Sequence, residues 1–162
     1  MNSRTFLFLL AVTMIVTASG EVHSQTTPPK IEAKLTISGD RVEPGRTINA
    51  SLTIDIPPGY HVNAHEPVSR FALATKIQVK APEGVRVGAI TYPKAIIRKF
   101  SFSDDRLGVY ENRTVIRIRL FVPANQPRRR GEIKAVLNYQ SCSNEVCFPP
   151  MKREISTPFS VS

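Results

Sequence analysis

The chain has 162 residues, of which 41% are hydrophobic and 22% charged, with 13 prolines, 2 cysteines and no tryptophan. This length suits one domain with one core, and the apolar fraction is too high for an intrinsically disordered chain. The formal net charge of +9 favours acidic partners. However, the densest basic run, Arg128 to Arg130, has no flanking aromatic residues, so we expect no nucleic-acid binding.

The N-terminal segment, residues 1–20, has the pattern of a secretory signal peptide. Arg4 precedes an apolar run over residues 6–16, and small residues follow up to Gly20. We expect cleavage after Gly20 or as late as Ser24, with the residues up to position 30 forming a flexible lead. No later run reaches the roughly 20 apolar residues that a spanning helix needs. The mature chain is therefore predicted to be exported and not membrane-spanning.

Alternation with period two dominates the rest of the chain, which is predicted to form one domain over residues 31–162. Apolar and polar residues alternate from Ile31 to Ile37 and from Ile48 to Ile56, and Pro-Gly turn segments punctuate the pattern. Further strands are expected over residues 76–80, 85–90, 114–122, 132–140 and 155–161. Short strands separated by turns at intervals of about ten residues predict an all-β, immunoglobulin-like β-sandwich.

Few residue patterns in this chain suggest catalysis or metal binding. The HExxH, GxSxG, GxGxxG and Walker motifs are absent. His61 and His65 are four positions apart, but nearby prolines indicate an extended chain, in which this spacing is about 13 Å and too long to share an ion. Asp104 and Asp105 are adjacent, as in a surface turn. We therefore expect no metal and no cofactor.

The two cysteines, Cys142 and Cys147, follow a predicted strand and are separated by a polar connection. A tight hairpin brings their Cα atoms within the roughly 4.4–6.8 Å that a disulfide needs, and an exported domain meets an oxidising compartment. A loop this short stabilises the fold by only roughly 2 kcal/mol. Lys152 and Arg153 lie close enough in sequence to lower a thiol pKa, whereas Glu145 opposes them.

Spacing and compartment leave several functions open. The pair is either exchangeable or a structural lock on a hairpin. In the second case the chain is a non-catalytic exported binding domain whose basic face docks a protein or an anionic polymer. A minor alternative is metal handling by Cys142, Cys147 and Met151, which are soft sulfur ligands. The discriminating property is whether the two cysteines cycle between thiol and disulfide.

The run LNYQSCSNEVCFPP, residues 137–150, resembles the cysteine segment of the N-terminal periplasmic domain of the thiol:disulfide interchange protein DsbD. Three other segments are also similar to that family. Residues 58–63 resemble its Gly-aromatic-His strand, residues 92–93 its Tyr-Pro step, and residues 109–111 the strand start after its active-site loop. The resemblance implies an immunoglobulin-like fold, in agreement with the independent strand prediction.

The resemblance also implies a function. Reduced Cys142 and Cys147 would pass electrons to oxidised thioredoxin-like periplasmic proteins, with Cys147 forming the mixed disulfide. A thioredoxin-like domain fed by a membrane electron-carrier protein would then reduce the pair again, in the context of cytochrome c biogenesis. The sequence ends soon after its last predicted strand, without counterparts of the membrane-spanning and C-terminal thioredoxin-like portions. We therefore expect a stand-alone module in the periplasm whose partners are separate chains.

Members of this family shield the disulfide beneath a cap loop that carries an aromatic residue and nearby carboxylates. The corresponding region here is residues 100–108. Phe102 is the candidate shield, and Asp104 and Asp105 are the candidate carboxylates, although here the aromatic residue precedes the acids, the reverse of the family pattern. Tyr139 is a second candidate to pack beside the disulfide. Ordinary packing in a strand or core is the alternative for both aromatic residues.

Overall fold

The computed structural model describes residues 27–39 and 41–162, so the predicted signal peptide lies outside the described residues. Within them the chain forms strands and no helix, and accordingly no helix that could cross a membrane. The strands are β1 (Glu32–Ile37), β2 (Thr47–Asp55), β3 (His61–Asn63), β4 (Lys76–Lys80), β5 (Arg86–Thr91), β6 (Ile96–Lys99), β7 (Arg106–Tyr110), β8 (Arg113–Phe121), β9 (Arg129–Tyr139), β10 (Ser141–Cys142) and β11 (Met151–Val161).

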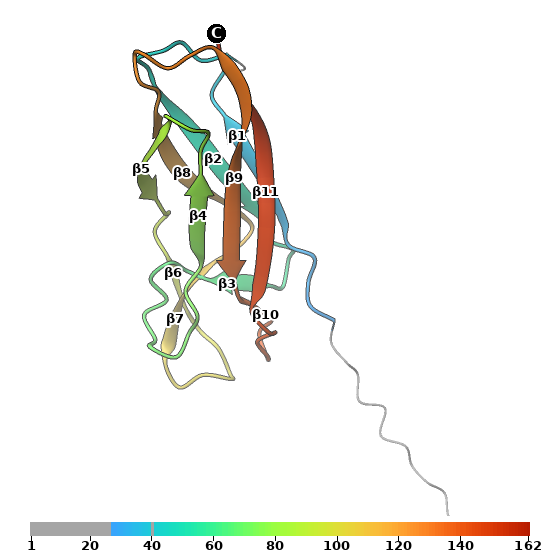
Figure 1. Cartoon of the computed structure of the whole chain (residues 1–162). Coiled ribbons are helices and arrows are strands. Elements are labelled where there is room, and N and C mark those ends of the chain that lie inside the picture. Colours follow the sequence, from blue (N-terminus) through green and yellow to red (C-terminus); the bar gives the residue numbers. More distant parts are fainter. Residues whose placement is uncertain (1–26, 40) are drawn as a thin grey trace, which may run out of the picture.

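The strands pair in antiparallel fashion into three sheets (Figure 1). A four-stranded sheet has the order β1-β2-β8-β5, and a three-stranded sheet has the order β11-β9-β4. These two sheets contribute to one hydrophobic core and form the sandwich. The third sheet, β10-β3-β7-β6, lies at one end of the molecule. The predicted all-β, immunoglobulin-like fold is confirmed.

The alternating residues form the core because every second side chain of a strand points to the same face of its sheet. In the register of β2 and β8, Leu52 lies opposite Ile116 and Ala50 opposite Ile118, and all four are buried. The three-stranded sheet contributes Leu137 of β9, which is also fully buried. Burying a large aliphatic side chain of this kind stabilises a fold by roughly 1.5–3 kcal/mol.

The seven strands predicted from alternation all occur, as β1, β2, β4, β5, β8, β9 and β11. The last begins at Met151 rather than at position 155, and it accommodates Pro158 because β11 is an edge strand. The alternation did not predict β3, β6, β7 and β10. These strands are two to five residues long, too short to display a period, and together they make the third sheet.

A turn at residues 57–59 carries the chain from the sandwich into the third sheet. Gly59 has a φ of +82°, in the left-handed region that glycine adopts without steric cost. The Tyr60 N–H donates a hydrogen bond to the Pro57 carbonyl oxygen at 3.2 Å and closes the turn. The turn thereby delivers β3 to its place beside β10 and the cysteines.

The sandwich core predicts a large cost for truncating its buried side chains. We expect Leu137→Ala to lower the free energy of unfolding by about 2–5 kcal/mol, because a cavity replaces the lost contacts. Lys134→Ala, at an exposed position of the same strand, should change it by less than about 0.5 kcal/mol. Urea unfolding of both variants measures the difference, and equal costs would contradict this assignment of the core.

Candidate functional site

Cys142 and Cys147 form a disulfide with an S–S distance of 2.07 Å and a Cα–Cα distance of 3.9 Å. The two residues face one another in an isolated antiparallel bridge. This is a non-hydrogen-bonded pair, the type with the shorter Cα spacing. The separation falls below the range predicted from the sequence. Two backbone hydrogen bonds flank it: from the Ser143 N–H to the Val146 carbonyl (2.8 Å) and from the Phe148 N–H to the Ser141 carbonyl (2.9 Å).

The connection between the cysteines is held by the Ser143 hydroxyl. Its hydroxyl oxygen accepts hydrogen bonds from the backbone N–H groups of Glu145 and Val146, both at 3.1 Å. A serine in this role forms a local turn that satisfies backbone donors. The connection is therefore a closed turn that keeps the two cysteines opposite each other.

Cys142 does not continue the strand that precedes it. Strand β9 ends at Tyr139, and Ser141 and Cys142 form the separate strand β10, which pairs with β3 in the third sheet. In this register Cys142 lies opposite His61. The side chains of His61, Cys142 and Cys147 consequently form one row across a single face of the ladder.

The two cysteines differ in exposure. Cys142 is fully buried, with 0% of its surface exposed, whereas Cys147 is partly exposed. Val146 and Met151, near Cys147 in the chain, present 43% and 42% of their surfaces to solvent. Cys147 is therefore the member of the pair that an approaching molecule meets first.

Three nearly parallel aromatic rings cluster beside the disulfide. The imidazole of His61 stacks on Phe100 with ring centroids 4.1 Å apart, and Phe100 stacks on Phe102 at 5.3 Å. Both phenylalanines belong to the loop of residues 100–105 between β6 and β7, which we call the cap loop. Phe102 itself is partly buried and reaches His61 only at 6.4 Å, so Phe100 makes the closer contact.

The cap loop is tied to its surroundings by hydrogen bonds. The Ser101 hydroxyl donates to the carbonyl of Asn144, which lies between the cysteines, at 3.2 Å. The Asp105 carboxylate accepts a hydrogen bond from the Ser69 hydroxyl at 3.0 Å, and the Asp104 carbonyl accepts one from the Lys99 ammonium at 2.7 Å. The loop that carries Phe102, Asp104 and Asp105 is thus anchored to the cysteine connection.

Three other residues considered in the sequence lie outside the cap loop, in the main core or on β11: Tyr139, Lys152 and Arg153. Tyr139 is buried in the main core, and burial raises the pKa of its phenol. On β11, the Lys152 ammonium pairs with Glu154 at 3.6 Å, and the Arg153 guanidinium donates a hydrogen bond to the backbone carbonyl of Ile31. The two cations considered as thiol-activating groups thus have other partners.

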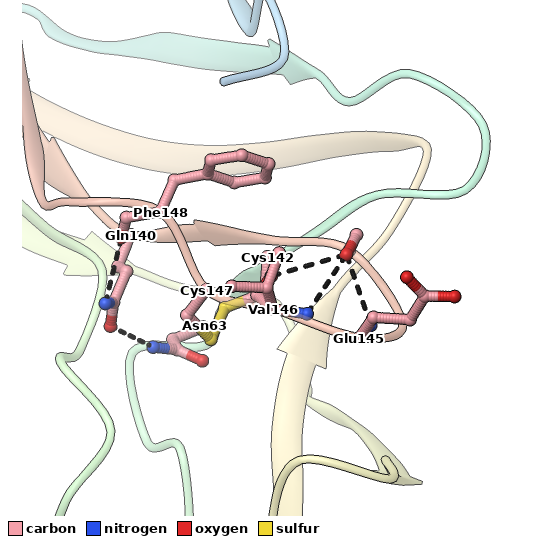
Figure 2. The surroundings of a disulfide bond; sticks show 8 residues. Asn63, Gln140, Cys142, Glu145, Val146, Cys147 and Phe148 are labelled. Carbon is pink, nitrogen blue, oxygen red and sulfur yellow. Dashed lines mark hydrogen bonds between the residues drawn. A yellow bond between two sulfur atoms is a disulfide. The ribbon is translucent and has the colours of Figure 1, made fainter. Parts of the chain in front are cut away.

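A polar network that sequence reasoning missed borders the disulfide (Figure 2). The Gln140 amide donates from Nε2 to the Phe148 carbonyl, and the Asn63 amide donates from Nδ2 to Gln140 Oε1, both at 3.1 Å. Three buried side-chain atoms of the described residues lack a hydrogen-bond partner, and all belong to β3 or β10: His61 Nε2, Asn63 Oδ1 and Ser141 Oγ. Unsatisfied buried polar atoms are rare in native folds, so their concentration here marks the site.

The environment of His61 keeps its imidazole neutral. Burial lowers the pKa of His61 to about 4, and the negative charge of Glu111 opposes this shift only in part. Glu111 is itself engaged by Arg98 in an ion pair at 2.9 Å, and this contact lowers the pKa of Glu111. An uncharged imidazole suits a ring that is buried and stacks on Phe100.

His61 and His65 have separate surroundings. His65 stacks on Tyr92 at 3.7 Å, and its Nδ1 lies 3.0 Å from the Thr75 carbonyl oxygen. Within the part of the chain that the structure describes, no three His, Cys, Asp or Glu side chains are grouped so that they could hold a metal ion.

The lowered pKa of His61 predicts a loss of stability in acid. Between pH 6.5 and 4 the unfolded chain binds a proton at this histidine and the folded chain does not, so the free energy of unfolding falls as the pH falls. The variant His61→Phe keeps an aromatic ring that can stack on Phe100, but it removes the titrating group and its contribution to the pH dependence of stability. We expect the difference in unfolding free energy between the two proteins to change by about 3 kcal/mol between pH 7 and pH 4. Urea unfolding at several pH values measures this difference. If the unfolding free energies of the two proteins changed in parallel with pH, the prediction would be wrong.

The family described as "Thiol:disulfide interchange protein DsbD, N-terminal" matches residues 19–158. Among solved structures, the chain resembles the DsbD N-terminal domain of Neisseria meningitidis in its reduced form, with a TM-score of 0.52 and 18% identity over 83% of this chain and 94% of that one. It also resembles the N-terminal periplasmic domain of ScsB from Proteus mirabilis, with a TM-score of 0.54 and 16% identity over 78% of this chain and 45% of that one. No curated protein matches. Because the family match spans most of the sequence and the fold agrees with it, the chain belongs to the family of DsbD N-terminal domains.

Proposed function

We propose that this chain is an exported thiol-disulfide exchange module that relays electrons through Cys142 and Cys147 to thioredoxin-like periplasmic proteins. The observation that carries the proposal is the asymmetry of the disulfide, in which Cys142 is buried and Cys147 is partly exposed at the surface end of a closed turn. A short hairpin disulfide contributes little stability, so a structural role alone gives little reason for this arrangement. Membership of a thiol:disulfide interchange family supports the same function.

In the proposed relay, the Cys147 thiolate attacks a disulfide of the target protein. One target sulfur joins Cys147 in a mixed disulfide, and the other leaves as a thiolate. The sulfur of Cys142 then attacks Cys147 Sγ, which restores the Cys142–Cys147 bond and releases the second target sulfur. Counted from the dithiol form, the pair loses two electrons and two protons, one proton when the Cys147 thiolate forms and the other when Cys142 attacks. The target disulfide takes up two electrons and two protons and becomes a dithiol.

The reverse exchange would recharge the module. A thioredoxin-like dithiol, supplied with electrons by a membrane electron-carrier protein, attacks Cys147 and is oxidised as the pair is reduced. We place these reactions in the periplasm, in keeping with the predicted signal peptide and with the periplasmic ScsB domain that this chain resembles. The exposed Val146 and Met151 offer an apolar rim on which a partner can dock beside Cys147.

The reduction potential of the pair, together with its exchange with thioredoxin, tests this proposal. We expect a value nearer to about −200 mV than to −300 mV and rapid exchange. The variant Cys142→Ser, which leaves the exposed cysteine, should trap a mixed disulfide with thioredoxin, visible on a non-reducing gel. The matched variant Cys147→Ser should trap much less, because its remaining sulfur is buried.

The alternative is a binding domain whose hairpin is merely locked by the disulfide. In that case the potential lies well below about −300 mV, exchange is slow, and neither cysteine variant traps thioredoxin. That combination would overturn the proposed relay.

The cap loop gives a further prediction for the reactivity of the disulfide. Phe102→Ala removes the more exposed of the two phenylalanine rings in this cluster, so we expect a small thiol such as dithiothreitol to reduce the disulfide several-fold faster, since exchange rates depend on access to the sulfur. Phe121→Ala, at a partly buried phenylalanine in β8 of the sandwich, is the control. Equal rates for both variants and the unchanged protein would show that Phe102 does not shield the sulfurs.

A further inference from the structure

The amide of Asn63 is held in one orientation by two hydrogen bonds. Gln140 donates from Nε2 to the Phe148 carbonyl and therefore presents its Oε1 to Asn63. Because Oε1 is an acceptor, the group of Asn63 that faces it must be the Nδ2 donor, at 3.1 Å. The amide oxygen of Asn63 is thereby directed away from Gln140. This atom, Oδ1, is buried and has no hydrogen-bond partner, and Asn63 is only 1% exposed.

The pairing of β3 with β10 places this oxygen beside the disulfide. The Asn63 N–H donates to the Gln140 carbonyl at 3.2 Å, so Asn63 lies opposite Gln140 as His61 lies opposite Cys142. Asn63 and Cys142 are therefore diagonal neighbours on one face, with Cα atoms roughly 7 Å apart, within reach of their side chains. Figure 2 shows the Asn63 amide next to the two sulfur atoms. His61, the directly opposite residue, instead stacks its ring on Phe100.

We propose that Asn63 Oδ1 is the hydrogen-bond acceptor for the thiol of Cys142 in the reduced protein. This assignment rests on the proposed function and deepens it, since it makes Asn63 a positioning residue of the exchange site. A disulfide sulfur carries no hydrogen, so the oxygen stays without a partner in the oxidised structure. A thiol is a donor, so the same oxygen is satisfied once the bond opens.

The chemistry balances with a dithiol as the reductant. A donor dithiol supplies two electrons and two protons, the Cys142–Cys147 bond breaks, two thiols form, and the donor becomes a disulfide. One of the new S–H groups, on the buried Cys142, donates to Asn63 Oδ1. The hydrogen bond favours the protonated form of Cys142 over its thiolate. Cys147 is consequently the nucleophile. Cys142 stays protonated until a mixed disulfide has formed on Cys147.

Replacing Asn63 with leucine, which has nearly the same shape, tests this assignment through the redox equilibrium. The variant Asn63→Leu removes an unsatisfied atom from the oxidised form and a hydrogen bond from the reduced form. Both effects make the disulfide harder to reduce. We expect the equilibrium constant for reduction by glutathione to fall about tenfold, or about 30 mV for a two-electron couple.

Ser141→Ala is the matched control for this equilibrium. Ser141 also has a buried oxygen without a partner, but it lies opposite Val62, on the other face of the ladder from Cys142. The control should leave the equilibrium constant within about twofold. A merely structural role of Asn63 would weaken the oxidised and reduced folds alike and leave this constant unchanged. An unchanged constant in Asn63→Leu would therefore overturn the proposal.

A spectroscopic measurement reports on the hydrogen bond directly. The variant Cys147→Ala retains one thiol, whose S–H stretching band is visible by infrared or Raman spectroscopy. We expect this band at the lower frequency of a hydrogen-bonded thiol, and at the frequency of a free thiol when Asn63→Leu is added. A free-thiol band in the single variant would overturn the proposal. This readout needs no exchange with a partner, so it separates a failure of this hydrogen bond from a failure of the proposed relay.

Discussion

The pairing of β3 with β10 is the constraint on which the site depends. The chain leaves the three-stranded sheet after Tyr139, and the two residues of β10 pair with β3. This register sets Cys142 opposite His61. The positions of the side chains contributed by β3 depend on this register. The stack of His61 on Phe100 holds the cap loop beside the cysteines. The same register places the Asn63 amide within hydrogen-bond distance of Gln140.

The sequence was sufficient for the sandwich because its strands are long enough to show a period. Alternation located the strands that form the main core, such as β2 and β8 with nine residues each. The third sheet was not predictable in the same way, because a strand of two or three residues has no measurable period. Its pairing is decided by contacts between segments about 80 residues apart, as in the hydrogen bond from Asn63 to Gln140.

The contrast between local patterns and long-range contacts also separates the predicted site residues from the ones that were missed. The spacing of Cys142 and Cys147 was informative because their pairing is local, and the family resemblance pointed to the loop that carries Phe102. Phe100 is a second phenylalanine in the same loop, and it differs from Phe102 in being buried and in lying closer to His61. Asn63 has no chemical motif around it. Its proposed role rests on the orientation that Gln140 imposes, which no local pattern encodes.

The placement of the site at one end of the molecule has an energetic reason. Three buried polar atoms without partners each cost about 1–3 kcal/mol, and a six-residue disulfide loop returns only roughly 2 kcal/mol. The third sheet therefore does not stabilise itself by these contacts, and the sandwich core must carry the fold. The core of buried aliphatic residues from β2, β8 and β9 supplies that stability and does not contain the two cysteines. In the proposed relay, Asn63 can then change its hydrogen bonding as the disulfide opens, while the sandwich keeps the domain folded.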